Sequence, residues 1–263
     1  MQLVAADSIS LSALAALFNE GFSDYLVPMR LSESQFRDHL QNNDIDLSCS
    51  RVLVEDEPVA FSLVGLRAEE AWIGGMGTVP ARRRRALGER ALVASMDAAS
   101  ERGASGVWLE VIDRNEPALR LYEKLGFELV RDLVVWSLTA PQDEPPRSRE
   151  VEPEEARAWI AAHRQSREPW QRSDAALRHM DGLRALMVES GAAVIYKRAD
   201  STTITMQITA GDEEAASEAL LAAAAGGGAL RLSNAPAGEP ASRALERLGA
   251  EQQVWQHEMR LAL

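Results

Sequence analysis

A short segment rich in proline and charged residues divides this chain into two parts. Residues 141–149 hold three prolines and no large apolar side chain. Such a composition interrupts helices and strands and is typical of a linker. The parts on either side, 1–140 and 150–263, each have the length of an ordinary domain. The sequence therefore predicts two domains joined by a linker at 141–149.

The first part alternates between helical and strand patterns. Apolar residues at helical spacing, preceded in two cases by a serine suited to an N-cap, predict helices over 10–18, 31–40, 86–101 and 116–125. Runs of β-branched and apolar residues predict strands over 51–55, 59–66, 71–79 and 106–112, and two short strands within 127–138. Helices interleaved with strands indicate an α/β (α+β) domain with a mixed sheet.

The second part repeats this order more faintly. Helices are predicted over 154–163, 174–189, 212–224 and 241–248, and strands over 192–197, 202–208, 229–232 and 253–263. The helix that ends at Gly126 and the helix that ends at Gly249 stand at corresponding places, each followed by a strand. The shared order of elements indicates an internal duplication.

Charge and composition exclude several classes of protein. The net charge of −12 disfavours a general nucleic-acid binder, which needs a basic surface to displace counterions. The single cysteine, Cys49, and four dispersed histidines predict neither a disulfide framework nor a metal site. No segment is apolar over the length that crosses a bilayer, and the first residues do not resemble a signal peptide. A cytoplasmic protein without membrane contact is expected.

Four consecutive arginines, Arg82–Arg85, stand out in this acidic chain. They lie between a predicted strand that ends at Val79 and a predicted helix that begins at Ala86. A helix start offers unpaired N–H groups and the positive end of the helix dipole, and the small residues Ala86 and Gly88 let an anion approach closely. This junction indicates a pyrophosphate site, whereas the arginine run by itself more often marks a solvated basic turn.

Two segments of the first part resemble the signatures of the Gcn5-related N-acetyltransferase (GNAT) superfamily. The first runs from Val79-Pro80 through Arg83-x-x-Ala86-x-Gly88 and is similar to the family's acetyl-CoA-binding signature, Gln/Arg-x-x-Gly-x-Gly/Ala. The second runs from Asn115 to Phe127 and is similar to the family's second signature almost position for position. The resemblance covers residues 3–138 and implies the GNAT fold, with a mixed and mostly antiparallel central sheet.

The resemblance also implies which residues hold acetyl-CoA. The main chain of Gly77 and Val79 is expected to pair with the pantetheine arm. Asn115 is expected to bond that arm, and Tyr122 to protonate the departing thiolate as general acid. By themselves, Asn115 would be a helix N-cap and Tyr122 a core aromatic residue. The pyrophosphate is expected on the loop and helix start formed by Arg83, Arg84, Arg85, Ala86, Leu87 and Gly88.

Two positions depart from the signature of the family. The family usually has glycine where this chain has Ala86, and often has glycine where it has Arg84. Alanine is expected to allow a right-handed helical start there, so that cofactor binding survives.

The general base and the acceptor site are less sharply defined. Glu110, on the strand 106–112, is the candidate base, and a structural salt bridge is the alternative. Aromatic residues beside a carboxylate could receive a cationic amine. The alternatives are that the loop after the first helix is packed by its own aromatic residues and that Trp72 is a core residue. The resemblance implies an acceptor site at the first two helices and their connection, so the acceptor amine is expected near Phe22, Asp24 and Tyr25, with Trp72 as another possible wall.

The second part lacks this equipment. Its corresponding helix start carries Asp212, Glu213 and Glu214, which suit a helix N-terminus but would repel a pyrophosphate. No tyrosine stands at the place that corresponds to Tyr122. The second part is therefore expected to be a degenerate, smaller GNAT-like domain that does not bind acetyl-CoA. It is expected to pack against the first part, to narrow the acceptor cleft or to form a homodimer.

The function predicted from these residues is acetyl-CoA-dependent N-acetyl transfer by direct attack of an amine. Cys49 lies apart from the cofactor signature, so no covalent intermediate is expected. The acceptor is a small-molecule or peptide amine whose identity is left open, and no metal is required. The alternative is a non-catalytic acyl-CoA-binding or sensor protein, and a structural interaction module is a third reading.

Overall fold

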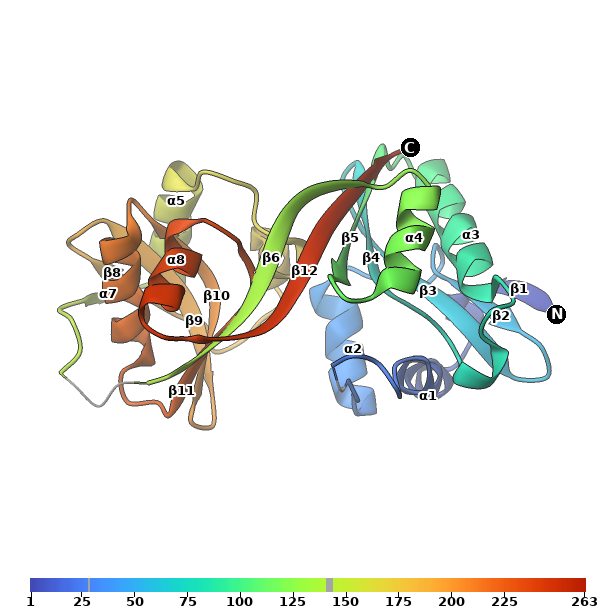
Figure 1. Cartoon of the computed structure of the whole chain (residues 1–263), viewed down its shortest axis with the longest axis horizontal. Helices are drawn as coiled ribbons and strands as arrows, with labels where there is room; N and C mark the ends of the chain where they lie inside the picture. Colours follow the sequence, from blue (N-terminus) through green and yellow to red (C-terminus); the bar gives the residue numbers. More distant parts are fainter. Residues whose placement is uncertain (28, 141–143) are drawn as a thin grey trace. The chain divides into compact units, whose positions relative to one another are not determined.

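The computed structural model describes residues 1–27, 29–140 and 144–263, which form two compact units (Figure 1). Unit 1 consists of Met1–Val130 together with Glu258–Leu263, and unit 2 consists of Arg131–His257. Part of the expected linker, 141–143, lies outside the described residues. The units differ from the two consecutive segments that the sequence suggests, because the end of the chain belongs to unit 1.

Unit 1 is built on a mixed sheet. Its strands lie in the order β1-β2-β3-β4-β5, followed by the end of β12. Neighbours from β1 to β4 pair antiparallel, whereas β4 and β5 pair parallel. The strands are β1 (Gln2–Ala5), β2 (Arg51–Val54), β3 (Pro58–Arg67), β4 (Glu70–Thr78) and β5 (Gly106–Ile112). The helices are α1 (Leu11–Gly21), α2 (Glu33–Asn42), α3 (Leu87–Glu101) and α4 (Glu116–Lys124), with short 3-10 helices η1 (Ala6–Ser8) and η2 (Pro80–Arg82).

Local side-chain chemistry sets the ends of several of these helices. Ser10 caps α1 by accepting a hydrogen bond from the N–H of Ala13. Ser32 and Gln35 form a reciprocal capping box at the start of α2. The chain leaves α4 through Gly126, whose φ of 91° lies in the left-handed region that favours glycine. These helix ends confirm the boundaries predicted from the sequence to within a few residues.

Two hydrophobic clusters hold unit 1 together. One cluster packs α1, α2 and the start of α3 against β2 and β3, with Phe18 and Phe61 among its buried side chains. The other packs α3 and α4 against β4, β5 and the end of β12, and it includes both Tyr122 and Met259. The second cluster therefore depends on a side chain from the far end of the sequence.

Unit 2 is built on a sheet in the order β12-β6-β11-β10-β9-β8-β7. Its β10 and β11 pair parallel, and β7, β8, β9 and β10 pair antiparallel in turn. The strands are β6 (Glu128–Thr139), β7 (Arg149–Val151), β8 (Arg184–Val188), β9 (Ala192–Ala199), β10 (Thr202–Ala210), β11 (Ala229–Pro236) and β12 (Glu251–Ala262). The helices are α5 (Pro153–His163), α6 (Asp174–Leu177), α7 (Glu213–Ala224) and α8 (Pro240–Arg247), with the 3-10 helix η3 (Trp170–Arg172).

The α-helices and strands from β7 to β12 repeat the order of those from β1 to β6. In each series one strand and two helices precede three strands, and then helix and strand alternate to the end. The parallel pair also falls at the same place, β4 with β5 and β10 with β11. This agreement supports the internal duplication that the sequence indicates.

Two expected elements are wrong. Residues 174–189 form the short helix α6 and the strand β8 rather than one helix. Gly182 has a φ of 70°, which interrupts the helical path between them. Residues 127–138 contribute to one long strand, β6, rather than two short ones. The strand β6 stays continuous because it pairs with β11 over most of its second half, with a single irregularity.

The longest strands, β6 and β12, lie side by side (Figure 1). Each strand has residues in both units. Strand β6 closes the first series in sequence but pairs with β11 of unit 2, whereas β12 ends the second series and lies next to β5 of unit 1. The two series therefore exchange their last strands.

No helix within residues 1–27, 29–140 and 144–263 combines the length and hydropathy needed to cross a membrane. Over the same residues, His, Cys, Asp and Glu side chains do not gather in a group of three or more that could hold a metal ion.

Candidate active site

Strands β4 and β5 separate near the middle of β4. Their parallel pairing covers Glu70–Trp72 and Gly106–Trp108 and extends no further along the described strands. A register shift against β3 places one extra residue, Gly74, in β4 just beyond the paired segment. Beyond this bulge, one edge of β4 has no strand partner among the residues that the structure describes. An extended ligand could add to such an edge by main-chain hydrogen bonds.

The main-chain groups on this edge are those of Met76 and Thr78. The N–H of Val79 donates to Val59 on β3, and the carbonyl of Val79 accepts from Arg82. Because main-chain groups alternate along a strand, Gly77 also faces β3, whereas Met76 and Thr78 face the opposite edge. Gly77 and Val79, which were expected to pair with the pantetheine arm, therefore face β3 instead, and Met76 and Thr78 face the free edge.

The start of α3 lies against this edge. A Cβ atom at Gly88 would lie 3.1 Å from Met76 Cε and 3.1 Å from Thr78 Oγ1, so only glycine fits easily. The N-cap residue, Ala86, provides no side-chain cap. The first-turn N–H groups, such as that of Leu87, accordingly point outward without a helical partner. This geometry fits the pyrophosphate of a coenzyme A derivative.

The backbone before α3 is left-handed at two non-glycine residues. Arg84 has a φ of 62°, and Ala86 has a φ of 54° with a ψ of 22°. The expectation of a right-handed helical start at Ala86 is wrong. The loop reverses direction so sharply that Ala86 must adopt a conformation in which its Cβ is crowded, which is why glycine is better suited there.

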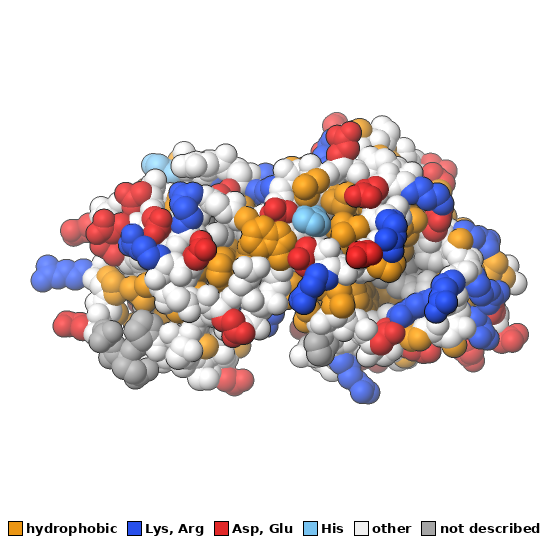
Figure 2. All heavy atoms as spheres, in the orientation of Figure 1, with side chains coloured by type: hydrophobic (Ala, Val, Ile, Leu, Met, Phe, Trp, Pro, Cys, Tyr) orange, Lys and Arg blue, Asp and Glu red, His pale blue; other side chains and the backbone are white. Residues whose placement is uncertain are grey.

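Three of the four arginines are held by carboxylates. Arg83 makes a two-pronged ion pair with Asp24, at 2.7 Å and 2.6 Å, and also donates to the carbonyls of Gly21 and Thr78. Arg82 and Arg85 both pair with Glu55. Figure 2 shows Lys and Arg side chains on the right of the view interspersed with carboxylates rather than forming one uninterrupted basic surface.

Arg84 differs from its three neighbours, since it makes no ion pair with any residue that the structure describes. Its side chain is exposed at the loop that precedes the start of α3. Of the arginines expected near the phosphates, Arg84 is therefore the one available without breaking an existing pair, whereas Arg83 and Arg85 would have to leave their carboxylates.

Asn115, Tyr122 and Tyr25 come together around the start of α4. Asn115 caps α4 by accepting from the N–H of Ala118, as its sequence context predicts. Burial raises the pKa of the Tyr25 hydroxyl, and a hydrogen bond from the Asn115 side chain acts in the opposite direction. Burial also raises the pKa of Tyr122 well above its usual value, with a smaller contribution from nearby Tyr25. A phenol in this environment keeps its proton at neutral pH.

Glu110 accepts a hydrogen bond from an indole. Its Oε2 accepts a hydrogen bond of 2.7 Å from Nε1 of Trp72, which links β5 to β4. Trp72 itself is buried, at 3% exposed. Trp72 therefore orients the candidate base and is less suited to form a wall of the acceptor site.

The loop after α1 carries the other expected acceptor residues. Phe22 packs on Phe18 at 4.7 Å between ring centroids and meets the edge of Tyr25 at 5.1 Å. Asp24 faces Arg83 instead of an open site, and that hydrogen-bonded pair lowers the pKa of Asp24. The loop is thus packed by its own aromatic residues and tied to the arginine loop, and residue 28 lies outside the described residues.

Two polar residues of unit 1 escaped the sequence analysis. His39, near the end of α2, contacts the carbonyl of the bulge residue Gly74 through Nε2 at 3.0 Å. Glu70 accepts from Nε1 of Trp108 and pairs with Arg260 near the end of the chain. Since these contacts join residues far apart in sequence, spacing alone gave no signal for them.

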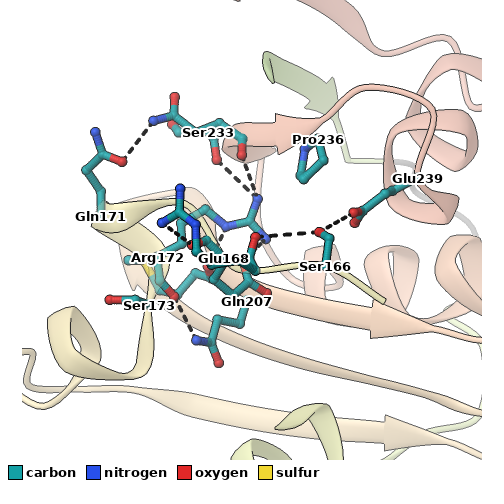
Figure 3. A network of polar contacts seen from close by, with 12 residues as sticks. Ser166, Glu168, Gln171, Arg172, Ser173, Gln207, Ser233, Pro236 and Glu239 are labelled. Atoms are coloured by element: carbon teal, nitrogen blue, oxygen red, sulfur yellow. Dashed lines mark hydrogen bonds and ion pairs between the residues drawn. The ribbon is translucent and has the colours of Figure 1, made fainter. Parts of the chain in front are cut away.

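The corresponding region of unit 2 is filled by a buried arginine (Figure 3). Arg172 pairs with Glu168 at 3.2 Å, and both side chains are largely buried, at 5% and 8% exposed. Arg172 also donates to the carbonyl of Met206 on β10 and to those of Ser233 and Asn234 on β11. The guanidinium therefore joins β10 and β11 where their pairing ends.

The start of α7 in unit 2 is capped from within. Asp212 accepts a hydrogen bond of 2.9 Å from the N–H of Ala215. Glu213 pairs with Arg243 and Arg247 of α8. The start of α7 therefore carries a negative charge from its own cap, whereas the start of α3 has no side-chain cap.

Comparison with known proteins finds similarities in the first part of the chain. The family model described as acetyltransferase (GNAT) family matches residues 12–127. A stretch of 77 residues is 34% identical to the ribosomal protein bS18-alanine N-acetyltransferase of Salmonella typhimurium, covering 29% of this chain and 52% of that protein. The same enzyme of Escherichia coli is 35% identical over 68 residues, or 26% of this chain and 46% of that protein. The chain thus spans about half the length of the curated relatives it matches.

Solved structures with low sequence identity share the fold over nearly the whole chain. A GCN5-related N-acetyltransferase from Sphaerobacter thermophilus has a TM-score of 0.72 at 17% identity, covering 99% of this chain and 95% of that chain. A tandem GNAT protein from the clavulanic acid biosynthesis pathway has a TM-score of 0.66 at 12% identity, covering 99% and 98%. These structures show that the chain has the fold of GNAT proteins, and residues 12–127 match the model of the acetyltransferase (GNAT) family.

Proposed function

We propose that unit 1 transfers the acetyl group of acetyl-CoA directly to an amine, with Tyr122 as general acid. The observation that carries this proposal is the buried Tyr122 hydroxyl close to Tyr25, in the segment that begins with the Asn115 cap. This segment matches the second family signature, and it follows directly on β5, which separates from β4.

Residues on two elements would hold the cofactor. The main chain of Met76 and Thr78 would pair with the pantetheine arm as a neighbouring strand does. The first N–H groups of α3, at Leu87 and Gly88, would bind the pyrophosphate together with the side chain of Arg84. Bound acetyl-CoA supplies an acetyl group activated as a thioester.

The side chains of unit 1 would move two protons. Glu110 would take a proton from the ammonium group of the acceptor, directly or through one water, so that the neutral amine nitrogen can attack the acetyl carbon. As the new C–N bond forms and the C–S bond breaks, Tyr122 would donate its proton to the departing sulfur. The nitrogen, now part of the amide, would release its second proton to water, from which Tyr122 would be reprotonated. The raised pKa of Tyr122 keeps that proton available at neutral pH.

The acceptor class is proposed from the relatives. The curated relatives are named for acetylation of an alanine of ribosomal protein bS18. An amine of a peptide or protein is therefore the first class to test, with small-molecule amines as the second. A panel of peptides and small amines, with release of free thiol as the readout, would separate the two classes.

Replacement of Tyr122 by phenylalanine tests the general-acid role. Tyr122→Phe should lower kcat about 100-fold, because a positioned general acid contributes at least this much. The dissociation constant for acetyl-CoA should change little, because the ring still fills its buried place. Tyr196→Phe, which changes a buried tyrosine of unit 2, is the matched control. An unchanged kcat in Tyr122→Phe would reject the role.

A chain that binds acetyl-CoA but acetylates no amine would favour the alternative of a non-catalytic acyl-CoA sensor. In either case unit 2 is proposed not to bind acetyl-CoA. Arg172 occupies the place where β10 and β11 would separate, and Asp212 caps the helix start. Titration calorimetry should give one equivalent of acetyl-CoA per chain, and two equivalents would contradict the assignment.

A further inference from the structure

The bulge at Gly74 decides which main-chain groups of β4 reach the free edge. One residue is added between the pair Val64–Ile73 and the pair Leu63–Gly75. Because strand residues alternate between two edges, one added residue reverses the alternation beyond it. Without the bulge, the main-chain groups of Gly75 and Gly77, rather than those of Met76 and Thr78, would face the place where a cofactor arm would pair.

The packing around Gly74 admits no side chain. A Cβ atom there would lie 2.6 Å from Ile45 Cδ1 and 2.6 Å from Trp72 Cζ3. Steric fit therefore allows the bulge only with glycine, but glycine alone does not hold a strand in one conformation, since it is the most flexible residue. A further contact is needed to fix the bulge.

His39 supplies that contact from α2. Its Nε2 lies 3.0 Å from the carbonyl oxygen of Gly74, which can only accept, so Nε2 carries the proton. Its Nδ1 then accepts from Nδ2 of Asn43, at 3.3 Å, and Asn43 also donates to the His39 carbonyl. Burial lowers the pKa of His39, which favours this neutral form. The tautomer and the direction of the imidazole are both set.

Unit 2 contains the same device with different residues. Its strand β10 has one extra residue, Met206, between the paired residues Thr205 and Gln207. Gly74 and Met206 are each the fifth residue of their strand, β4 and β10. The carbonyl of Met206 accepts from Nε of Arg172 at 2.8 Å, as the carbonyl of Gly74 accepts from His39. Both copies of the fold therefore hold this bulge by a side-chain donor.

The two donors, His39 and Arg172, differ in whether they also bond the neighbouring strand across the gap. Arg172 reaches carbonyls of both β10 and β11, whereas His39, among the described residues, reaches the carbonyl of Gly74 on β4 and no carbonyl of β5. The smaller imidazole fixes the bulge and leaves the β4 edge beyond it free for a ligand. This difference accompanies the proposed difference in cofactor binding between the units.

We propose that His39 is a positioning residue for acetyl transfer: by fixing the Gly74 bulge, it directs the main-chain groups of Met76 and Thr78 toward the acetyl-CoA arm. This role rests on the proposed function of unit 1. It assigns no proton transfer to His39, which acts through the backbone of β4.

Three variants test the role. His39→Leu removes the donor and keeps an apolar side chain of similar reach, and His39→Gln keeps an N–H that can bond the Gly74 carbonyl. Phe36→Leu, on the same helix and fully buried, is the control for a general loss of packing. The readouts are kcat, the dissociation constant of acetyl-CoA, the melting temperature, and amide hydrogen exchange at Gly75 and Gly77.

In His39→Leu, kcat should fall about tenfold or more, because small displacements of reacting groups are costly, while acetyl-CoA affinity changes less than kcat. Exchange at Gly75 and Gly77 should speed up, since their N–H groups bond β3 only while the bulge is in place. His39→Gln should restore most of kcat and most of the slow amide exchange at Gly75 and Gly77. A loss of kcat no greater than in Phe36→Leu would overturn the role.

The exchange measurement separates this role from the proposed function. If the unchanged chain acetylates no amine in the panel, acetyl transfer fails as the function of unit 1, whatever His39 does. Equal exchange at Gly75 and Gly77 in all three variants and the unchanged chain would then show that His39 does not fix the bulge, and it would overturn the positioning role on its own.

Discussion

At the scale of single residues, Ala86 shows how one backbone angle limits what a sequence pattern can tell. The signature has glycine at this place, and the chain keeps the left-handed turn with alanine, at a φ of 54°. A β-carbon in that conformation costs about 1 kcal/mol relative to glycine. The sequence predicted the start of the helix to within one residue, but the left-handed φ of Ala86 became visible only in the backbone.

Replacing Ala86 by glycine should therefore stabilise unit 1. We expect Ala86→Gly to raise the free energy of unfolding by about 1 kcal/mol, since the left-handed conformation no longer crowds a Cβ atom. Ala94→Gly, in the middle of α3, should lower it by a similar amount, about 1 kcal/mol. Urea unfolding of the two variants measures both effects. A loss of stability in Ala86→Gly would mean that the turn is not strained.

Asp24 and Arg83 were assigned separately from the sequence, to the acceptor and to the phosphates. The structure pairs them with each other, with N–O distances of 2.7 Å and 2.6 Å. A separation of 59 positions in sequence hides such a pair from any reading of local spacing. Their mutual charge compensation means that neither side chain is free for the role expected of it.

Breaking this pair should strengthen cofactor binding. Asp24→Asn removes the carboxylate that holds Arg83, which can then turn toward the pyrophosphate. Because exposed ion pairs are weak, the dissociation constant of acetyl-CoA should fall only about two- to fivefold. Calorimetry at low salt measures the change. Glu55→Gln, which releases Arg82 and Arg85, is the matched variant, and a weaker affinity in Asp24→Asn would contradict the expectation.

At the scale of helices and strands, hydrophobic periodicity predicted most of the elements. Strand β5 coincides with the predicted 106–112, and α3 begins one residue after the predicted start. The short edge strands β1 and β7 were missed, because three or four residues carry too little periodicity and become strands only by pairing. Helix α6 and strand β8 were merged into one helix, because their apolar residues fit either period.

The polar contacts between elements were beyond the reach of the sequence. Arg172 lies in η3, a segment with no predicted element, yet it joins β10 and β11 through three carbonyls. Nothing in local spacing distinguishes this arginine from the other arginines of the chain. Its role follows from burial, since a buried guanidinium must find acceptors for its donors.

Removing that guanidinium should destabilise unit 2. Arg172→Met leaves Glu168 buried without its cation, and it leaves the carbonyls of Met206 and Asn234 without this donor. Loss of one partner of a buried ion pair costs about 3–5 kcal/mol. Arg149→Met, which breaks an exposed pair with Glu155, should leave the unfolding midpoint nearly unchanged. Thermal unfolding compares the two variants, and similar midpoints would show that the network contributes little.

At the scale of the whole molecule, the division into two units could be predicted, but their composition could not. The prolines of the linker indicate two domains, and the compact units agree with that number. The exchange of β6 and β12 follows from pairing between strands that are far apart in the sequence, β5 with β12 and β6 with β11. Local patterns show that a segment is a strand and leave its partner undetermined, because many strands share similar apolar alternation.

The exchange predicts that the first part of the chain cannot fold well alone. A fragment of residues 1–140 lacks Met259, which is buried in the second cluster of unit 1, and Arg260, which pairs with Glu70. It also leaves the second half of β6 without β11, as an unpaired edge. The fragment should therefore melt well below the full chain and be cleaved faster by a protease.

The fragment lacks both β12 and unit 2. Two point variants of the full chain show how much of its instability comes from the loss of β12 alone. Met259→Ala should lower the free energy of unfolding by about 2–5 kcal/mol, because it leaves a cavity in the core of unit 1. Leu263→Ala, at an exposed terminal side chain, should change it little. Circular dichroism and limited proteolysis follow all three proteins. If residues 1–140 melt cooperatively at the temperature of the full chain, then β12 is dispensable for unit 1, and the cluster around Tyr122 is complete without it.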